Sequence, residues 1–190
     1  MSAALLQAPS SLQDAKDLLT DQGFATSTIW YHGTSSALLP SILKQGLKRS
    51  GDKAMNQMAK QTMATIGNTF TETVEPVFLT QSKEIAFYWA QQTVRNRSVR
   101  FEGDEQPIVL AVSLPDDEAA KVRPDVGAAS LLMVKDGESY LAFIAGLYDQ
   151  AGATVPEVNV MKADRMDYLN KLGMAYYDND IPAQYLTAIS

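Results

Sequence analysis

The only histidine of the chain lies in a short run of residues that could bind a ligand. His32 follows Trp30 and Tyr31 at the end of an aromatic, strand-like stretch, and it precedes Gly33. Imidazole can donate and accept a hydrogen bond near neutral pH, and a glycine lets another molecule approach the main chain closely. The run therefore predicts a ligand-binding corner. A lone histidine with a purely structural role is the competing interpretation.

The composition excludes several kinds of chemistry. The chain has 190 residues, no cysteine and a formal net charge of −6 at pH 7. Without cysteine there are no disulfides and no thiolate catalysis, and one histidine without clustered carboxylates predicts no metal site. Phosphate binding needs local basic charge, so the acidic balance makes a nucleic-acid partner possible but not favoured.

No export signal or membrane partner is expected. The N-terminus lacks a basic segment followed by an apolar core, and no stretch reaches the roughly 18 apolar residues of a membrane span. The predicted location is the cytoplasm, or a target cell that the protein reaches without a Sec signal peptide. The length predicts a single domain over residues 1–190.

Hydrophobic periodicity predicts an α+β fold in which strands lead into helices. The elements predicted in the first half are a helical extension at about 10–23, a strand at 24–32, a helix at 36–45, a variable loop or insertion at about 50–75, a strand at 76–80 and a helix that Ser82 caps. In the second half they are strands at 107–114, 154–161 and 184–189 and helical pieces at 116–121 and 127–134. The apolar segment 139–148 fits either a helix or a strand.

Three separated motifs together resemble one family of enzymes. They are Tyr31-His32-Gly33-Thr34-Ser35, then Ile42-Leu43-Lys44-Gln45-Gly46-Leu47, and then Val77-Phe78-Leu79-Thr80 with Ala86-Phe87-Tyr88-Trp89-Ala90. Their order and spacing are similar to the NAD-binding core of ADP-ribosyltransferases of the His-Tyr-Glu class, the diphtheria-toxin and poly(ADP-ribose) polymerase type. The resemblance covers roughly residues 32–90. It implies a split antiparallel β-sheet core with flanking helices and a cleft that holds NAD.

The resemblance also assigns NAD-binding roles to five residues. It implies that His32 hydrogen-bonds the adenosine ribose, that the main chain of Gly33 meets the nicotinamide amide, and that Thr34 belongs to the same site. It further implies that Tyr88 stacks on the nicotinamide ring and that Phe78 closes the other side, where an aromatic face can stabilise a cation by roughly 0.5–2 kcal/mol. Phenylalanine departs here from the more usual tyrosine. Core packing is the competing interpretation for both rings.

The third signature of the family is a catalytic glutamate on a late strand. Glu157 is the best match, because it lies in the alternating segment predicted as a strand at 154–161. A carboxylate there would stabilise the positive charge that develops on the ribose as the nicotinamide bond breaks. Glu138, which precedes another apolar segment, is the alternative.

The function implied by the resemblance is NAD-dependent transfer of ADP-ribose to a macromolecule. A protein acceptor fits the acidic balance better than a nucleic acid does. Three alternatives stay open: a non-catalytic binding or inhibitor module on the same fold, an NAD hydrolase, and an enzyme like the RNA 2′-phosphotransferases. The last would need several basic residues to hold the RNA phosphate.

Overall fold

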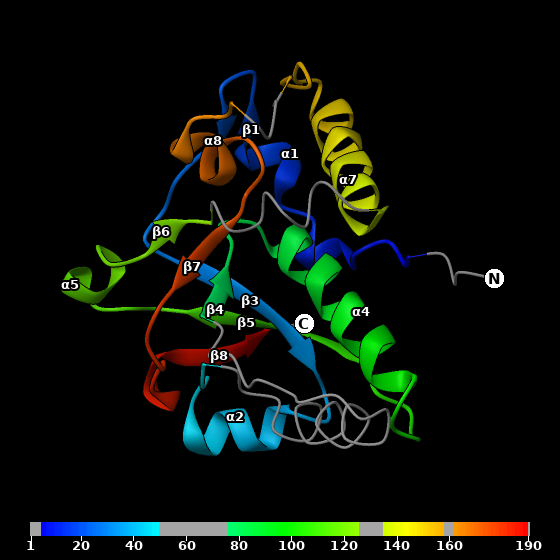
Figure 1. The fold of residues 1–190 in the computed structure, drawn as a ribbon, viewed down its shortest axis with the longest axis vertical. Coiled ribbons are helices and arrows are strands. Elements are labelled where there is room, and N and C mark those ends of the chain that lie inside the picture. The colour runs from blue at the N-terminus through cyan, green and yellow to red at the C-terminus, as the bar shows by residue number, and fades with distance from the viewer. Residues whose placement is uncertain (1–4, 50–75, 126–134, 158–161, 190) are drawn as a thin grey trace, which may run out of the picture.

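A computed structural model describes residues 5–49, 76–125, 135–157 and 162–189 (Figure 1). The helices that it describes are η1 (Ser10–Leu12), α1 (Ala15–Leu18), α2 (Leu39–Gln45), α4 (Lys83–Ser98), α5 (Asp116–Ala119), α7 (Lys135–Ala151), α8 (Arg165–Asn170) and η3 (Ala183–Tyr185). The strands are β1 (Leu19–Thr20), β2 (Gly23–Phe24), β3 (Trp30–Ser35), β4 (Val77–Leu79), β5 (Pro107–Val112), β6 (Arg123–Pro124), β7 (Ala175–Tyr177) and β8 (Leu186–Ile189). The fold is mixed α+β, as the sequence predicts.

Two three-stranded antiparallel sheets form the centre of the molecule. Their strand orders are β3-β5-β8 and β4-β7-β6. Tyr31 in β3 and Thr80, just after β4, form a bridge between the sheets, in which each N–H donates to the other residue's carbonyl at 2.8 and 3.0 Å. The two sheets are therefore connected at one end of β3.

The apolar strand β5 lies at the centre of its sheet and pairs with β3 and β8. Val109, Leu110 and Val112 are at most 1 % exposed, as expected for a strand that is covered on both faces. Val109 packs with Ala86 and Phe87 of α4, whereas Leu110 and Val112 belong to the core between the two sheets. The helix α4 thus covers one face of the β3-β5-β8 sheet (Figure 1).

A very close contact sets the position of α4 on this sheet. A Cβ atom at Gly33 would lie 2.0 Å from the carbonyl oxygen of Ala86 and 2.6 Å from the backbone nitrogen of Ala90. Only a glycine on the strand and small residues on the helix permit this approach. On its other side α4 packs against α7, with Tyr88 among Tyr140, Ile144 and Leu147.

The starts of α1 and α4 cap one another. Asp14, the N-cap of α1, accepts hydrogen bonds from the Lys83 N–H at 2.7 Å and the Glu84 N–H at 3.3 Å. Glu84, in the first turn of α4, accepts in return from the Ala15 N–H at 2.9 Å. The Ser82 hydroxyl caps α4 as predicted and accepts from the Ile85 N–H at 3.3 Å. These contacts satisfy N–H groups that helix starts leave unpaired.

Several predicted boundaries in the first half are wrong. The opening helix breaks after Leu18, because β1 and β2 form a hairpin and Gly23 adopts a φ of 110°. The strand predicted at 24–32 is two strands, β2 and β3, and the helix predicted at 36–45 begins only at Leu39. The strand at 76–80 and the helix after Ser82 are confirmed by β4 and α4.

In the second half, α7 resolves the ambiguous segment 139–148 as a helix, and the sequence analysis missed α8 and β7. Strand β5 confirms the predicted strand at 107–114, and β8 the one at 184–189. The predicted loop at about 50–75 and the helical piece at 127–134 lie outside the described residues.

Candidate functional site

The strands β3 and β4 diverge directly beyond the bridge between Tyr31 and Thr80. If their antiparallel pairing continued, Gly33 would face Phe78, and the Gly33 N–H would donate to the Phe78 carbonyl. The His32 Nδ1 lies 2.8 Å from that carbonyl oxygen instead. The imidazole therefore occupies the place where the next main-chain donor would stand, and the sheet splits there.

This contact determines which nitrogen of His32 carries the proton. A carbonyl oxygen only accepts, so Nδ1 donates, and in the neutral ring Nε2 is left as an acceptor. The side chain is half-buried. Desolvation lowers the pKa of His32, and the hydrogen bond to the Phe78 carbonyl opposes that shift. The ring is therefore biased towards its neutral form, with an acceptor nitrogen that no residue in the described ranges engages.

The main chain of Gly33 presents a donor and an acceptor at the same split. The peptide groups of Tyr31 point to Thr80, and groups two residues apart on a strand point to the same side, so those of Gly33 also point away from β5. No hydrogen bond joins Gly33 to β4. Its N–H and C=O are thus available at the edge, as far as the described residues show.

The end of β3 is held by a charged network. The Ser35 hydroxyl donates to Glu105, and the Arg97 Nε donates to the same carboxylate oxygen at 2.7 Å. The Arg97 guanidinium lies 4.6 Å from the ring centroid of Phe101. The hydrogen bond from Arg97 is the main cause that lowers the pKa of Glu105. Sequence analysis missed this network, which fixes the strand end on which His32 and Gly33 depend.

The other predicted site residues differ in how accessible they are. Phe78 is brought next to His32 through its carbonyl, and its side chain is 47 % exposed. The Thr34 side chain is 2 % exposed, so it offers little surface to a ligand. Phe78 faces Tyr176 in the pairing of β4 with β7, and sequence analysis did not single out Tyr176 because it missed β7.

Tyr88 is not brought together with His32. Side chains alternate along a strand, so His32 points away from the face that α4 covers, whereas Tyr31 packs with Phe87 of α4. Tyr88 is 3 % exposed and stacks on Phe143 of α7, with ring centroids 4.6 Å apart. The ring of Phe87 packs with the sheet beside Ala86, whereas Tyr88 belongs to the core between α4 and α7.

The strand predicted at 154–161 is wrong where the structure describes it. Residues 154–157 have no regular secondary structure, and 158–161 lie outside the described residues. Val155 is 46 % exposed, and none of the described strands pairs with this segment. Glu157 is therefore an exposed residue of irregular chain, and Glu138 is an exposed residue of α7. The described late strands β7 and β8 contain no glutamate.

Three basic residues near these elements pair with carboxylates. Lys48 pairs with Asp180 at 3.7 Å and Arg49 with Asp178 at 3.5 Å, and Arg97 pairs with Glu105. Each of these pairs neutralises a positive charge that could otherwise contact a polyanion. In the described ranges no group of three or more acidic or histidine side chains could hold a metal ion, and no helix has the length and apolarity to cross a bilayer.

Comparison with known proteins finds no relative of this chain. No family model, curated protein or solved structure matches the chain. The function must therefore be argued from the site itself.

The groups at the split suit one part of a dinucleotide. A primary carboxamide, like that of nicotinamide, has one carbonyl acceptor and one NH₂ donor, and the Gly33 main chain offers the complementary pair. A ribose hydroxyl can donate to the His32 Nε2. These are the residues that could hold NAD.

Proposed function

We propose that this chain is an NAD-dependent ADP-ribosyltransferase that binds NAD at the split between β3 and β4. The observation that carries the proposal is the replacement of a main-chain hydrogen bond by His32, which leaves the Gly33 N–H and C=O directed to the split. The proposed acceptor is a macromolecule, with a protein favoured over a nucleic acid. NAD would supply an activated ribose carbon that the acceptor attacks as nicotinamide leaves.

The residues at the split would act by binding and orientation. The Gly33 main chain would fix the carboxamide, and the neutral His32 would accept from a ribose hydroxyl through Nε2. The exposed ring of Phe78 would cover an apolar or cationic ring surface. The catalytic carboxylate of this proposal is Glu157, which would have to approach the split from irregular chain.

Two variants of His32 test the binding part of the proposal. His32→Asn keeps an N–H donor for the Phe78 carbonyl but lacks the outer acceptor, whereas His32→Ala removes both. We expect both variants to weaken NAD binding at least about tenfold by calorimetry, the cost of roughly one hydrogen bond of 1.4 kcal/mol. Only His32→Ala should also lower the melting temperature. Wild-type NAD affinity in folded His32→Asn would contradict the assignment.

The chemical step is tested with labelled NAD and a cell extract. Nicotinamide release and labelled macromolecules are followed together, for the wild type and for Glu157→Gln. Label on a protein with the wild type only would support transfer. Release without label would indicate hydrolysis. Equal turnover in Glu157→Gln would remove Glu157 from the catalytic role, and Glu138→Gln would then be tested in the same way.

A second candidate is a binding module that keeps the NAD site and lacks turnover. It is favoured by one observation, that neither predicted glutamate lies on a strand and that the described β7 and β8 carry none. It predicts NAD binding that depends on His32, with neither nicotinamide release nor label transfer.

A further inference from the structure

A small cavity lies between α4, α7 and the N-terminal segment. Its volume is about 260 Å³. Its walls come from three places: Glu84, Phe87, Tyr88 and Gln91 on α4, Phe143, Gly146, Leu147 and Gln150 on α7, and residues 5–8 of the N-terminal segment. This size is slightly below the usual range for pockets that bind drug-sized ligands, so an occupant would be small.

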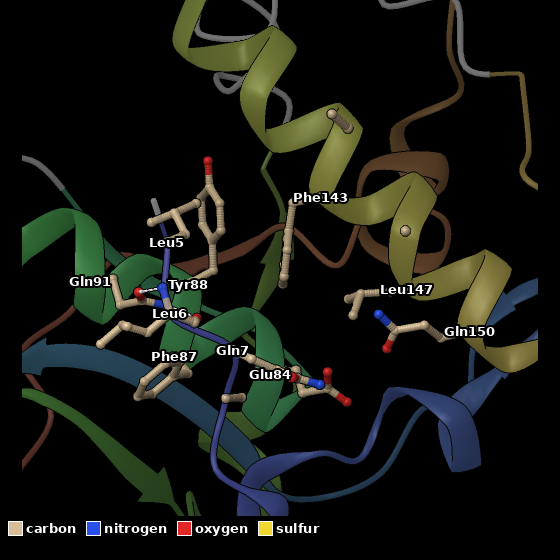
Figure 2. A pocket seen from close by; sticks show the side chains of 13 residues that line it. Leu5, Leu6, Gln7, Glu84, Phe87, Tyr88, Gln91, Phe143, Leu147 and Gln150 are labelled. Carbon is tan, nitrogen blue, oxygen red and sulfur yellow. Dashed lines mark hydrogen bonds between the residues drawn. The ribbon is translucent and has the colours of Figure 1, made fainter. Parts of the chain in front are cut away.

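The N-terminal segment forms one wall of the cavity and is held to α4 by a specific contact. The Gln91 side chain accepts from the Leu6 N–H at 2.7 Å and donates to the Leu6 carbonyl at 2.9 Å. One amide thus pairs both polar groups of one main-chain residue, which holds the segment extended across the helix (Figure 2). This wall of the cavity is consequently anchored to α4.

Gly146 keeps part of this cavity open. It lies in the interior of α7, where glycine costs about 1 kcal/mol relative to alanine. A glycine inside an element is often explained by a close neighbour, as for Gly33 in β3. A Cβ at Gly146 would meet no atom within 4 Å, so close packing does not require glycine here. The glycine therefore leaves space that an alanine or a larger residue would fill.

The cavity wall carries a buried acidic group. Glu84 is 8 % exposed, and none of the described lysines or arginines forms an ion pair with it. Desolvation is the main cause that raises the pKa of Glu84, and the hydrogen bond from the Ala15 N–H is the main cause that opposes this shift. The charge of Asp14 also raises the pKa, and the charge of Lys16 lowers it. Figure 2 shows Glu84 and Gln150 at one end of the cavity and the stacked rings of Tyr88 and Phe143 at the other. One end is thus acidic and polar, and the other is aromatic.

We propose that this cavity is a binding site for a compact organic cation, with an ammonium group at Glu84 and an aromatic or branched alkyl body against the apolar walls at Phe143, Gly146 and Leu147. A carboxylate stabilises an ammonium group through a charge-assisted hydrogen bond, and the apolar walls bury the body of the ligand. The site lies across α4 from the split between β3 and β4. It therefore does not depend on the proposed NAD site.

The test is a titration of the full chain with benzylammonium, and with benzyl alcohol as an uncharged probe of almost the same shape. We expect saturable binding of benzylammonium by calorimetry and a higher melting temperature. Benzyl alcohol should bind at least about tenfold more weakly, because it forms no ion pair with Glu84. Equal affinity for the two probes, or no binding of benzylammonium at millimolar concentration, would overturn the proposal.

Two kinds of variant locate the probe. Glu84→Gln keeps an acceptor for the Ala15 N–H and removes the charge, so it should abolish the preference for benzylammonium. Gly146→Leu should fill the cavity and weaken binding of both probes at least tenfold while the chain stays folded, and Gly146→Ala should retain most of the binding. Unchanged binding in Gly146→Leu would place the probe elsewhere and refute the site. NAD affinity should be the same in all these variants.

Discussion

The two sides of α4 differ in how closely they pack: small residues allow a close contact with β3, whereas aromatic rings fill the space towards α7. On the side of β3, Ala86 and Ala90 let a strand glycine approach to contact distance, and the polar groups of that strand point to a split in the sheet. On the side of α7, stacked aromatic rings fill the space, apart from the cavity at Gly146. The position of a residue along α4 decides which side of the helix its side chain faces. Tyr88 therefore points to the core between α4 and α7, although the sequence motif assigned it to the NAD site. The two sides should therefore respond differently to mutation.

Truncation of Tyr88, on the side of α4 that faces α7, should cause the largest loss of stability. Tyr88→Ala removes a ring that is 3 % exposed and stacked on Phe143, so we expect a loss of about 3–5 kcal/mol in the free energy of unfolding, measured with urea. NAD affinity of the remaining folded protein should be unchanged. A selective loss of NAD binding with little loss of stability would return Tyr88 to the NAD site.

The close contact between Gly33 of β3 and Ala86 of α4 is tested by adding one methyl group at Gly33. In Gly33→Ala the new Cβ would overlap the Ala86 carbonyl, so α4 must shift, and we expect a loss of about 3 kcal/mol by chemical denaturation. Ala90→Gly provides a control on the helix, since it keeps the space and costs only about 1 kcal/mol of helix propensity. A Gly33→Ala chain as stable as wild type would mean that the helix and strand lie further apart.

Removal of the Asp14 cap should have an intermediate effect on the free energy of unfolding. Asp14→Ala leaves the Lys83 and Glu84 N–H groups of α4 without their acceptor, and we expect a loss of about 1–2 kcal/mol. Asp14→Asn, which keeps an acceptor oxygen, should lose less. Equal losses in the two variants would show that the charge, not the hydrogen bonds, stabilises the helix start.

The smallest expected effect is the pH dependence at His32. Because burial lowers its pKa below the ordinary value of 6.5, the unfolded chain binds more protons than the folded chain when the pH falls below about 6.5. The contribution of His32 to stability is therefore complete above that pH and is lost as the pH falls towards the lower folded pKa. Urea denaturation between pH 8 and pH 5 should show a steeper loss in the wild type than in His32→Asn. Parallel curves would contradict the assigned direction.

The sequence predicted those helices and strands whose local residue pattern matches their burial in the folded chain. Ser82 is a good N-cap before a helical pattern, and the apolar run of β5 could only be buried, so α4 and β5 were predictable. The alternation around Glu157 looked equally regular. A strand, however, needs a neighbour that accepts its hydrogen bonds and covers its apolar face, and the sequence pattern alone does not contain that neighbour.

The candidate site was predictable only in part. His32 and Gly33 were found because a unique histidine beside a glycine is a local signal, and both lie at the split. The Tyr88 prediction depended on helix register, since a shift of one residue along α4 changes the face, and Phe87 is the ring that meets the sheet. Asp14, Glu84 and Glu105 act across distances of up to 70 residues or between separate elements, which no local pattern reports.

The mutual capping of α1 and α4 also constrains how the chain can fold. The Asp14 and Glu84 contacts join segments separated by about 70 residues, so the N–H groups of Ala15, Lys83 and Glu84 lack these acceptors until that long loop has closed. The first turns of the two helices should consequently order together and late, as expected for contacts between distant parts of a chain. In native-state hydrogen exchange, the amides of Ala15, Lys83 and Glu84 should then open as one unit, with a shared free energy of opening.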